Sequence, residues 1–111
     1  EDGALDFTQT AASIDARLRA FTPWPGGYFD HGETRVKVGK CTLAESITSE
    51  QPGSVIVAGE TLDVVTGMGL LRIHELQRPG GRMLPVSEFL RGSSIPVGEV
   101  LISISSHSLL V

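Results

Sequence analysis

Few side chains in this sequence have the chemistry of a catalytic or metal site. His31 falls in an expected turn, His74 in an expected strand and His107 in the tail, and nothing in their spacing indicates that they converge. The single cysteine, Cys41, cannot form an internal disulfide, which fits a reducing compartment, and we expect it to be a small buried side chain. One cysteine and scattered histidines also lack the ligand spacing of a zinc site. The sequence therefore predicts no catalytic residue and no metal in this chain.

Basic side chains are the other group that could bind a ligand, because Lys and Arg neutralise phosphates. The chain has nine of them against thirteen acidic residues, a net charge of -4, which argues against coating a nucleic acid by overall charge alone. They fall on an expected helix, a hairpin, a later strand and the region of a late loop: Arg17 and Arg19; Arg35, Lys37 and Lys40; Arg72; and Arg78, Arg82 and Arg91. One stripe and a scattered distribution both remain open, so any polyanion must meet a local patch.

Two segments are rich in glycine, as phosphate-binding loops are, but their surrounding sequence differs from that of such loops. Gly67–Gly69 and Gly80–Gly81 lack the strand, spacing and helix that such a loop requires, so we interpret both as turns. The stretch Gln77–Arg82 is expected to be a mobile, exposed loop that holds two guanidinium groups.

The elements that must position the basic residues begin with a helix. Between Asp6 and Phe21 the apolar side chains recur at the i, i+4 and i+7 positions of one face. These residues are Ile14, Leu18 and Phe21. Thr8 or Thr10 can cap the start with a side-chain hydroxyl, and Pro23 ends the helix because it has no amide proton.

A hairpin is predicted after the helix. Tyr28–Phe29 and Thr34–Val38 read as two short strands joined by a loop of about four residues, Asp30–Glu33. In the second strand the two valines should face the core, and the basic residues between them should face water. Gly39 is interpreted as a bulge after this strand.

The second half of the chain reads as more strands and one short helix. The polar stretch Thr42–Pro52 is expected to be a surface connection. The segments expected to form a three-stranded meander and a last strand are Ser54–Val57, Leu62–Thr66 and Leu70–Leu76, and then Val100–Ser105. Pro85–Arg91 should form one or two helical turns, with Pro85 at the first position and Gly92 just past the last.

Length and composition favour one mainly β domain. A chain of 111 residues can bury a continuous core, and short β-rich runs separated by glycine favour a small barrel or sandwich. No apolar run approaches the roughly 18 residues that a membrane span needs. Because the chain opens on Glu1-Asp2-Gly3, we expect it to be a segment of something longer.

A distinctive run of residues follows the predicted helix. Residues 21–26 read Phe-Thr-Pro-Trp-Pro-Gly and include the only tryptophan. With Arg17–Ala20 before them, they resemble the Arg-Ala-Phe-Asn-Pro-Trp-Pro-Gly signature that opens the C-terminal domain of methionyl-tRNA formyltransferases. The residues that carry this signature here are Phe21, Pro23, Trp24, Pro25 and Gly26. Later matches follow in the same order, between about Asp6 and about Leu101: Arg35–Val38, Pro52–Gly53, Leu76–Gln77, Gly81–Met83 and Phe89–Gly92.

The resemblance implies a fold and a division of labour. It implies an OB-like Greek-key barrel preceded by an N-terminal helix and carrying one short late helix, in a cytoplasmic enzyme of translation initiation. Residues 1–7 would end an interdomain linker, 8–105 would form the barrel domain and 106–111 a tail. In the family, an N-terminal Rossmann-like catalytic domain of the same polypeptide binds formyl-tetrahydrofolate. No catalytic residue is carried over to this chain, and no cofactor or metal is expected in it.

The resemblance also implies a partner, initiator methionyl-tRNA. The positions that match basic sites of the family are Arg35, Lys37 and Arg82, with Lys40 near them, and their implied role is to hold phosphates. Family members often have a bulky residue where this chain has Gly39, and adjacent basic residues where it has a single Arg82 behind two glycines. An accessory clamp of weak affinity is therefore expected.

Trp24 has two interpretations. An exposed aromatic ring on a barrel could stack on a base, whereas a tryptophan between two prolines more often wedges a helix against a sheet. We favour the wedge.

Two other functional classes stay open at this stage. The domain could be the structural barrel of a related formyltransferase that acts on a sugar nucleotide or on formyl-tetrahydrofolate. It could also be a free-standing interaction module.

Overall fold

A computed structural model describes residues 5–20, 27–31, 33–45 and 50–101 of the chain. They form eight strands and two helices: α1 Ala11–Ala20, β1 Gly27–His31, β2 Thr34–Val38, β3 Cys41–Ala44, β4 Val55–Ala58, β5 Leu62–Val65, β6 Leu70–Ile73, β7 Glu75–Gln77, β8 Leu84–Pro85 and α2 Val86–Gly92. The mainly β class with one early and one late helix is confirmed. The signature residues Phe21, Pro23, Trp24, Pro25 and Gly26 lie outside the described residues, as does His107.

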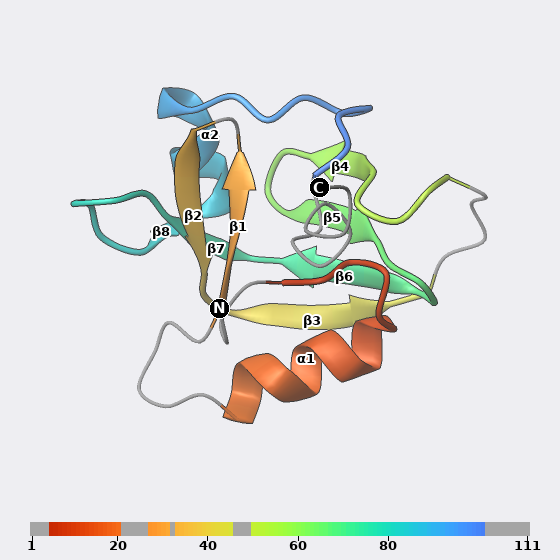
Figure 1. Ribbon diagram of the computed structural model, residues 1–111. Coiled ribbons are helices and arrows are strands. Elements are labelled where there is room, and N and C mark those ends of the chain that lie inside the picture. The colour runs from red at the N-terminus through yellow and green to blue at the C-terminus, as the bar shows by residue number, and fades with distance from the viewer. Residues whose placement is uncertain (1–4, 21–26, 32, 46–49, 102–111) are drawn as a thin grey trace, which may run out of the picture.

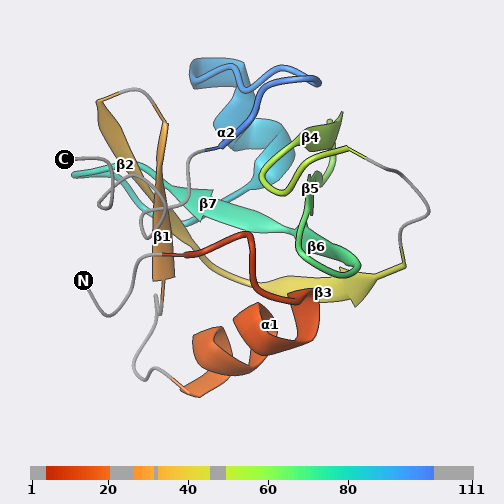
Figure 2. The same ribbon diagram turned by 45° about the vertical axis from the view of Figure 1, so that its right-hand side comes forward.

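The strands form two four-stranded antiparallel sheets (Figure 1). One has the order β1-β2-β7-β8 and the other β3-β6-β5-β4. Helix α1 runs beneath β3 and packs on β3 and β6, while α2 lies at the opposite end against β7 and β8 (Figures 1 and 2). The two sheets enclose one core, and the OB-like Greek-key closure remains a prediction.

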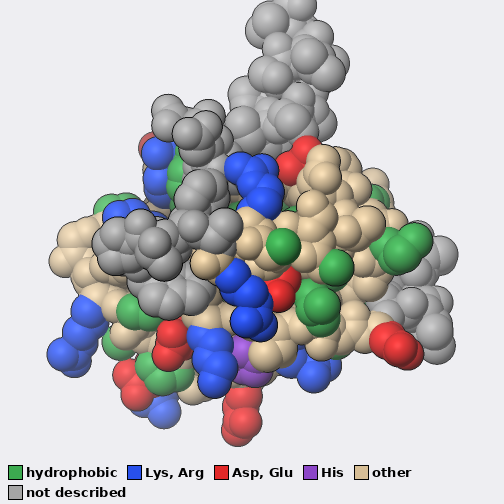
Figure 3. Space-filling model, turned by 90° about the horizontal axis from the view of Figure 1, so that it is seen from below, with side chains coloured by type: hydrophobic (Ala, Val, Ile, Leu, Met, Phe, Trp, Pro, Cys, Tyr) green, Lys and Arg blue, Asp and Glu red, His purple; other side chains and the backbone are tan. Residues whose placement is uncertain are grey.

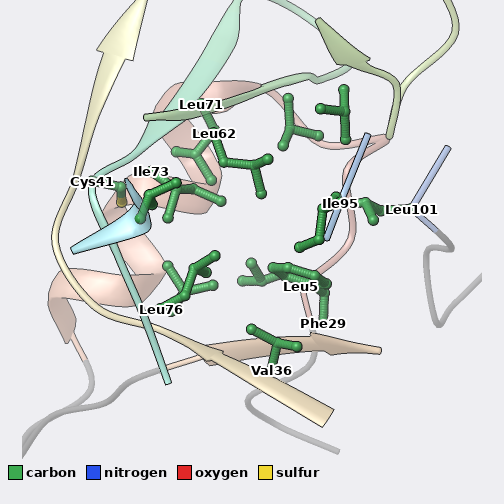
Figure 4. Packing of buried hydrophobic residues seen from close by; sticks show 14 of the residues in the cluster. Leu5, Phe29, Val36, Cys41, Leu62, Leu71, Ile73, Leu76, Ile95 and Leu101 are labelled. Atoms are coloured by element: carbon green, nitrogen blue, oxygen red, sulfur yellow. The ribbon is translucent and has the colours of Figure 1, made fainter. Parts of the chain in front are cut away.

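The core lies between the two sheets (Figure 4). Phe29 and Val36 enter it from the first sheet, and Leu62 and Leu71 from the second. Alternation along each strand explains this arrangement, because successive side chains of a strand point to opposite faces. Leu5 also belongs to this core, so apolar packing begins before α1. The predicted domain boundaries remain predictions.

Helix α1 starts after one of its two expected caps. It begins at Ala11, and the Thr10 Oγ1 atom accepts a hydrogen bond of 3.0 Å from the backbone N–H of Ser13, so Thr10 is the cap. Thr8 is not the cap, because its amide and its hydroxyl both donate to the Asp6 carboxylate in a local turn before the helix. Ile14 is buried, as expected of the apolar face.

The hairpin of β1 and β2 is confirmed with a shorter loop. Asp30 and His31 belong to β1 and pair with Arg35 and Thr34, so the predicted four-residue loop is wrong. Their pairing with β2 supplies the backbone hydrogen bonds that a loop would leave to water. The expected alternation in β2 holds, with the valines buried and the basic residues exposed.

The chain crosses between the sheets at two adjacent corners. Gly39 donates its amide to the Glu75 carbonyl at 2.9 Å, and His74 donates its amide to the Lys40 carbonyl at 2.8 Å. The expected single strand Leu70–Leu76 is therefore wrong, because it breaks at His74 into β6 and β7. These paired amides satisfy the backbone at the point where both segments leave one sheet for the other.

The structure corrects three further predictions made from the sequence. Residues 42–44 pair with β6 as part of β3, so the predicted surface connection begins too early. Gly39 occupies the corner after β2 and no register shift occurs at the preceding pairs, so the bulge interpretation is wrong. Pro85 is the cap residue of α2 and pairs with Glu75, so it is not the first helical residue, and Gly92 lies within the helix. The meander of β4, β5 and β6 is confirmed.

The last described residues return to the second sheet. Val100 forms an isolated antiparallel bridge with Ser54, and the Leu101 amide donates to the Gly53 carbonyl at 2.8 Å. The predicted strand Val100–Ser105 extends beyond the described residues after Leu101.

Candidate nucleic-acid interface

Strand β2 presents two cations on one face. Arg35 and Lys37 are exposed and alternate with Val36 and Val38, which are buried. The period of a strand places the two basic side chains on the outer surface of the β1-β2-β7-β8 sheet. Two phosphates of a nucleic-acid backbone could be reached from this strand without disturbing the core.

Neighbouring side chains hold Arg35 in place. Its Cζ atom lies 3.9 Å from the centroid of the Tyr28 ring, which is a cation–π contact. Its Nε atom lies 3.5 Å from Oδ1 of Asp30, the residue directly opposite it on β1. Both members of this ion pair are open to solvent, so the pair is weak and leaves the guanidinium available to a phosphate.

Lys40 follows at the corner between the two sheets. Its side chain is exposed, and its amide donates to the Glu75 Oε1 atom at 3.3 Å. A Cβ atom on Gly39 would lie 2.8 Å from the Met83 Sδ atom, so glycine allows the corner to approach the segment before β8 closely. The bulky residue expected from the family has no room here in the observed packing.

Arg82 lies in the exposed loop between β7 and β8. The Gln77 Nε2 atom donates to the Gly81 carbonyl at 2.7 Å, and Gln77 is the register partner of Lys37. This hydrogen bond joins the loop to β7, the strand beside β2. Arg82 directly follows Gly81 in the chain and directly precedes Met83. The structure brings the elements that carry Arg35, Lys37, Lys40 and Arg82 side by side, and we call these four residues the β2 patch.

The remaining described cations have other surroundings. Arg72 forms a bidentate ion pair with buried Asp63 at 3.0–3.2 Å, and this pair raises the pKa of the guanidinium. Arg78 lies over the Phe89 ring and donates to the Ser93 Oγ atom, so it supports α2. The view from below shows basic side chains interleaved with acidic ones across the face that includes α1 and β3 (Figure 3). Arg72 and Arg78 are thus engaged by the fold, and the β2 patch remains the candidate interface.

The groups considered for catalysis do not converge in the described part of the chain. His31 contacts the Glu99 carboxylate, whereas the His74 Nε2 atom lies 2.9 Å from the Thr42 Oγ1 atom. Burial, and to a smaller extent the nearby Asp15 carboxylate, raises the pKa of the Cys41 thiol to about 12, so this cysteine is a poor nucleophile. Within the ranges that the structure describes, no group of three acidic, His or Cys side chains could hold a metal ion.

One relevant pair was missed by the sequence reading. The Arg19 Nε atom donates to the Asp15 Oδ2 atom at 2.8 Å on α1. The i,i+4 spacing of the two residues was a signal for it, because such pairs meet on a helix surface. The cross-strand pair of Asp63 and Arg72 had no such signal, because its geometry depends on the register of β5 and β6.

No helix among the described residues is both long and apolar enough to cross a bilayer. This finding is consistent with the short apolar runs of the sequence.

Comparisons with known proteins identify relatives for almost the whole chain. The formyl transferase C-terminal domain family matches residues 1–94. A methionyl-tRNA formyltransferase from Gluconobacter oxydans is 40% identical over 103 residues, which is 92% of this chain and 33% of that protein. One from Gluconacetobacter diazotrophicus is 41% identical over 98 residues, 88% of this chain and 32% of that protein. The chain spans about a third of the length of these curated relatives.

A solved structure supports the fold. A variant of HypX from Aquifex aeolicus superposes with a TM-score of 0.64 at 20% sequence identity, covering 86% of this chain and 18% of that one. At this identity the similarity is one of fold.

Proposed function

Because the chain belongs to the formyl transferase C-terminal domain family, we propose that it is the tRNA-binding portion of a cytoplasmic methionyl-tRNA formyltransferase. In this proposal the β2 patch holds phosphates of initiator methionyl-tRNA. The observation that carries it is the placement of Arg35 and Lys37 on one solvent-facing side of β2, beside the loop of Arg82. The substrate in this proposal, methionyl-tRNA, is taken from the names of the curated relatives.

The charges of the chain favour an accessory role. With a net charge of -4, the chain cannot attract RNA by its overall field, so binding depends on the few cations of the β2 patch. Phosphate contacts fix the position of a nucleic acid and carry no sequence information directly. Selection of the initiator tRNA and formyl transfer therefore belong to the N-terminal catalytic domain, which would also bind formyl-tetrahydrofolate.

A chimera tests this proposal as an activity. The chain would replace the matching third of the Gluconobacter oxydans enzyme, and formylation of methionyl-tRNA would be measured. We expect the chimera to be active and to lose activity when Arg35 and Lys37 are changed to Gln, mainly through a raised KM for tRNA. A matched control changes Arg91, an exposed cation on α2, to Gln and should leave activity unchanged.

The outcomes separate the functional classes. A chimera that folds but has the same KM with and without the two cations contradicts the tRNA-binding role and favours a purely structural barrel. The activity assay of the chimera is accompanied by a direct binding assay. In this assay, filter binding of initiator tRNA to the chain is measured across a salt series. The absence of binding even at low salt also counts against the proposal.

A further inference from the structure

A small hollow lies between α1 and β3 and adjoins the β2 patch at Lys40. It has a volume of about 190 Å³ and is lined by Asp15, Leu18, Arg19, Lys40, Cys41 and Thr42. Lys40 belongs to both the patch and the hollow, so the two features are continuous. On this lower face the basic side chains lie among acidic ones, and exposed apolar side chains occur mainly at its right (Figure 3).

The guanidinium of Arg19 is held at this hollow by a carboxylate beneath it. The Asp15 side chain is 12% exposed, whereas that of Arg19 is 69% exposed, so the pair joins a buried anion to an open cation. The other Asp15 oxygen, Oδ1, accepts a bond of 3.6 Å from the Cys41 thiol. Both oxygens of the carboxylate are thus occupied, which fixes its orientation and that of Arg19.

The contacts of Arg19 leave donors available. In the described part of the chain its ion pair uses the Nε atom, and the two terminal NH₂ groups remain to donate outward. Those terminal groups are the part of a guanidinium that can bind two oxygens of one phosphate. A planar donor held in advance loses little conformational entropy on binding.

The other groups at the hollow are compatible with an anion. The Lys40 ammonium adds a second positive charge, and the Thr42 hydroxyl, which contacts the His74 Nε2 atom at 2.9 Å, adds a polar group. Asp15 is the single carboxylate among the residues that line the hollow, and the Glu75 carboxylate lies beside the Lys40 amide. The attraction for an anion therefore depends on the exposed ends of the Arg19 and Lys40 side chains and not on a net positive charge of the region.

We propose that Arg19, oriented by Asp15, is a second phosphate-binding position, and that the RNA backbone passes from the β2 patch over Lys40 to this hollow between α1 and β3. The inference rests on the proposed tRNA-binding function and extends its surface from one sheet to the helix. It gives Asp15 a positioning role, because the carboxylate acts on the RNA only through Arg19.

The test is the salt dependence of binding between the chain and an initiator tRNA transcript. For Arg19→Gln we expect the slope of log Kobs against log salt concentration to become shallower by about 0.7 to 0.9, the change for one phosphate contact. Arg91→Gln on α2 is the matched control and should keep the original slope. Arg19→Lys keeps the charge and should restore the slope but only part of the binding lost in Arg19→Gln, because an ammonium cannot reproduce the two-oxygen contact of a guanidinium.

Urea unfolding of each variant accompanies the binding series, so that a fold defect is recognised. An unchanged slope for Arg19→Gln, with shallower slopes for Arg35→Gln and Lys37→Gln, overturns this inference and leaves the proposed function standing. Failure of Arg19→Lys to restore the slope in a folded chain also overturns it, because the charge that neutralises the phosphate is kept. If none of these substitutions alters binding, the proposed function fails, and this inference fails with it.

Discussion

The two sheets contain the same cross-strand pair in different surroundings. Asp30 and Arg35 are direct register partners on β1 and β2, and Asp63 and Arg72 are direct register partners on β5 and β6. In the first pair the carboxylate side chain is 37% exposed and the shortest contact is 3.5 Å. In the second the carboxylate is 2% exposed and the shortest contact is 3.0 Å.

The burial of the carboxylate determines whether its arginine partner is available to bind a ligand. A buried carboxylate has lost its water and depends on its partner, so Arg72 is committed to the fold. An exposed carboxylate exchanges its partner with solvent at little cost, so Arg35 is available to a phosphate. An arginine on a strand is therefore a candidate ligand-binding residue only when the residue opposite it is known to be solvated.

The largest expected effect is on the buried pair. Arg72→Met leaves the Asp63 carboxylate with only the Thr61 hydroxyl as a described side-chain partner, at 3.0 Å. We expect a loss of about 2 to 4 kcal/mol in the free energy of unfolding, measured by urea denaturation, and no change in the salt slope of tRNA binding. Arg35→Met is the matched control and should cost less than about 1 kcal/mol. Equal losses for the two variants would contradict the comparison.

A smaller effect is expected at the corner that joins the sheets. Gly39→Ala places a Cβ atom 2.8 Å from the Met83 Sδ atom and 2.9 Å from the Glu75 Oε1 atom. We expect a loss of about 1 kcal/mol in unfolding free energy, because the Met83 and Glu75 side chains must shift to make room. Gly59→Ala meets no atom within 4 Å and is the control, with an expected change below about 0.5 kcal/mol. A neutral Gly39→Ala variant would show that the corner is loosely packed.

The stability of the fold should fall in alkaline solution because of Cys41. The ordinary pKa of a thiol, 9.0, rises to about 12 here, chiefly because the side chain is buried. The unfolded chain therefore loses this proton first, and the folded chain loses stability as the pH rises from about 9 toward 12. Urea denaturation at pH 8 and pH 10.5, in reducing agent, should show a steeper decline for the native chain than for Cys41→Ala. Parallel declines would sink the prediction.

The fold and the site were predictable to different extents. Alternation in β2 placed Arg35 and Lys37 correctly, because a strand with two buried valines must expose the residues between them. The break at His74 was not predictable, since Leu70–Leu76 is a continuous β-prone run and only pairing with the Lys40 corner divides it. The different roles of Arg35 and Arg72 depend on the cross-strand register of each pair and on the burial of the carboxylate opposite, which the local pattern of residue types does not contain.

The smallest effect concerns the exposed pair itself. Asp30→Asn removes the negative charge opposite Arg35 and should tighten tRNA binding by about twofold, because an exposed pair contributes about 0.5 kcal/mol. Filter binding at low salt is the measurement. Weaker binding by Asp30→Asn would indicate that the carboxylate positions Arg35 and does not compete with the phosphate.

The central claim is that the exposed cations of β2 hold RNA phosphates, and the salt slope of initiator tRNA binding tests it most directly. The account predicts that Arg35→Gln with Lys37→Gln makes this slope shallower by about 1.4 to 1.8, while the free energy of unfolding falls by less than about 1 kcal/mol. An unchanged slope in the folded double variant would contradict it.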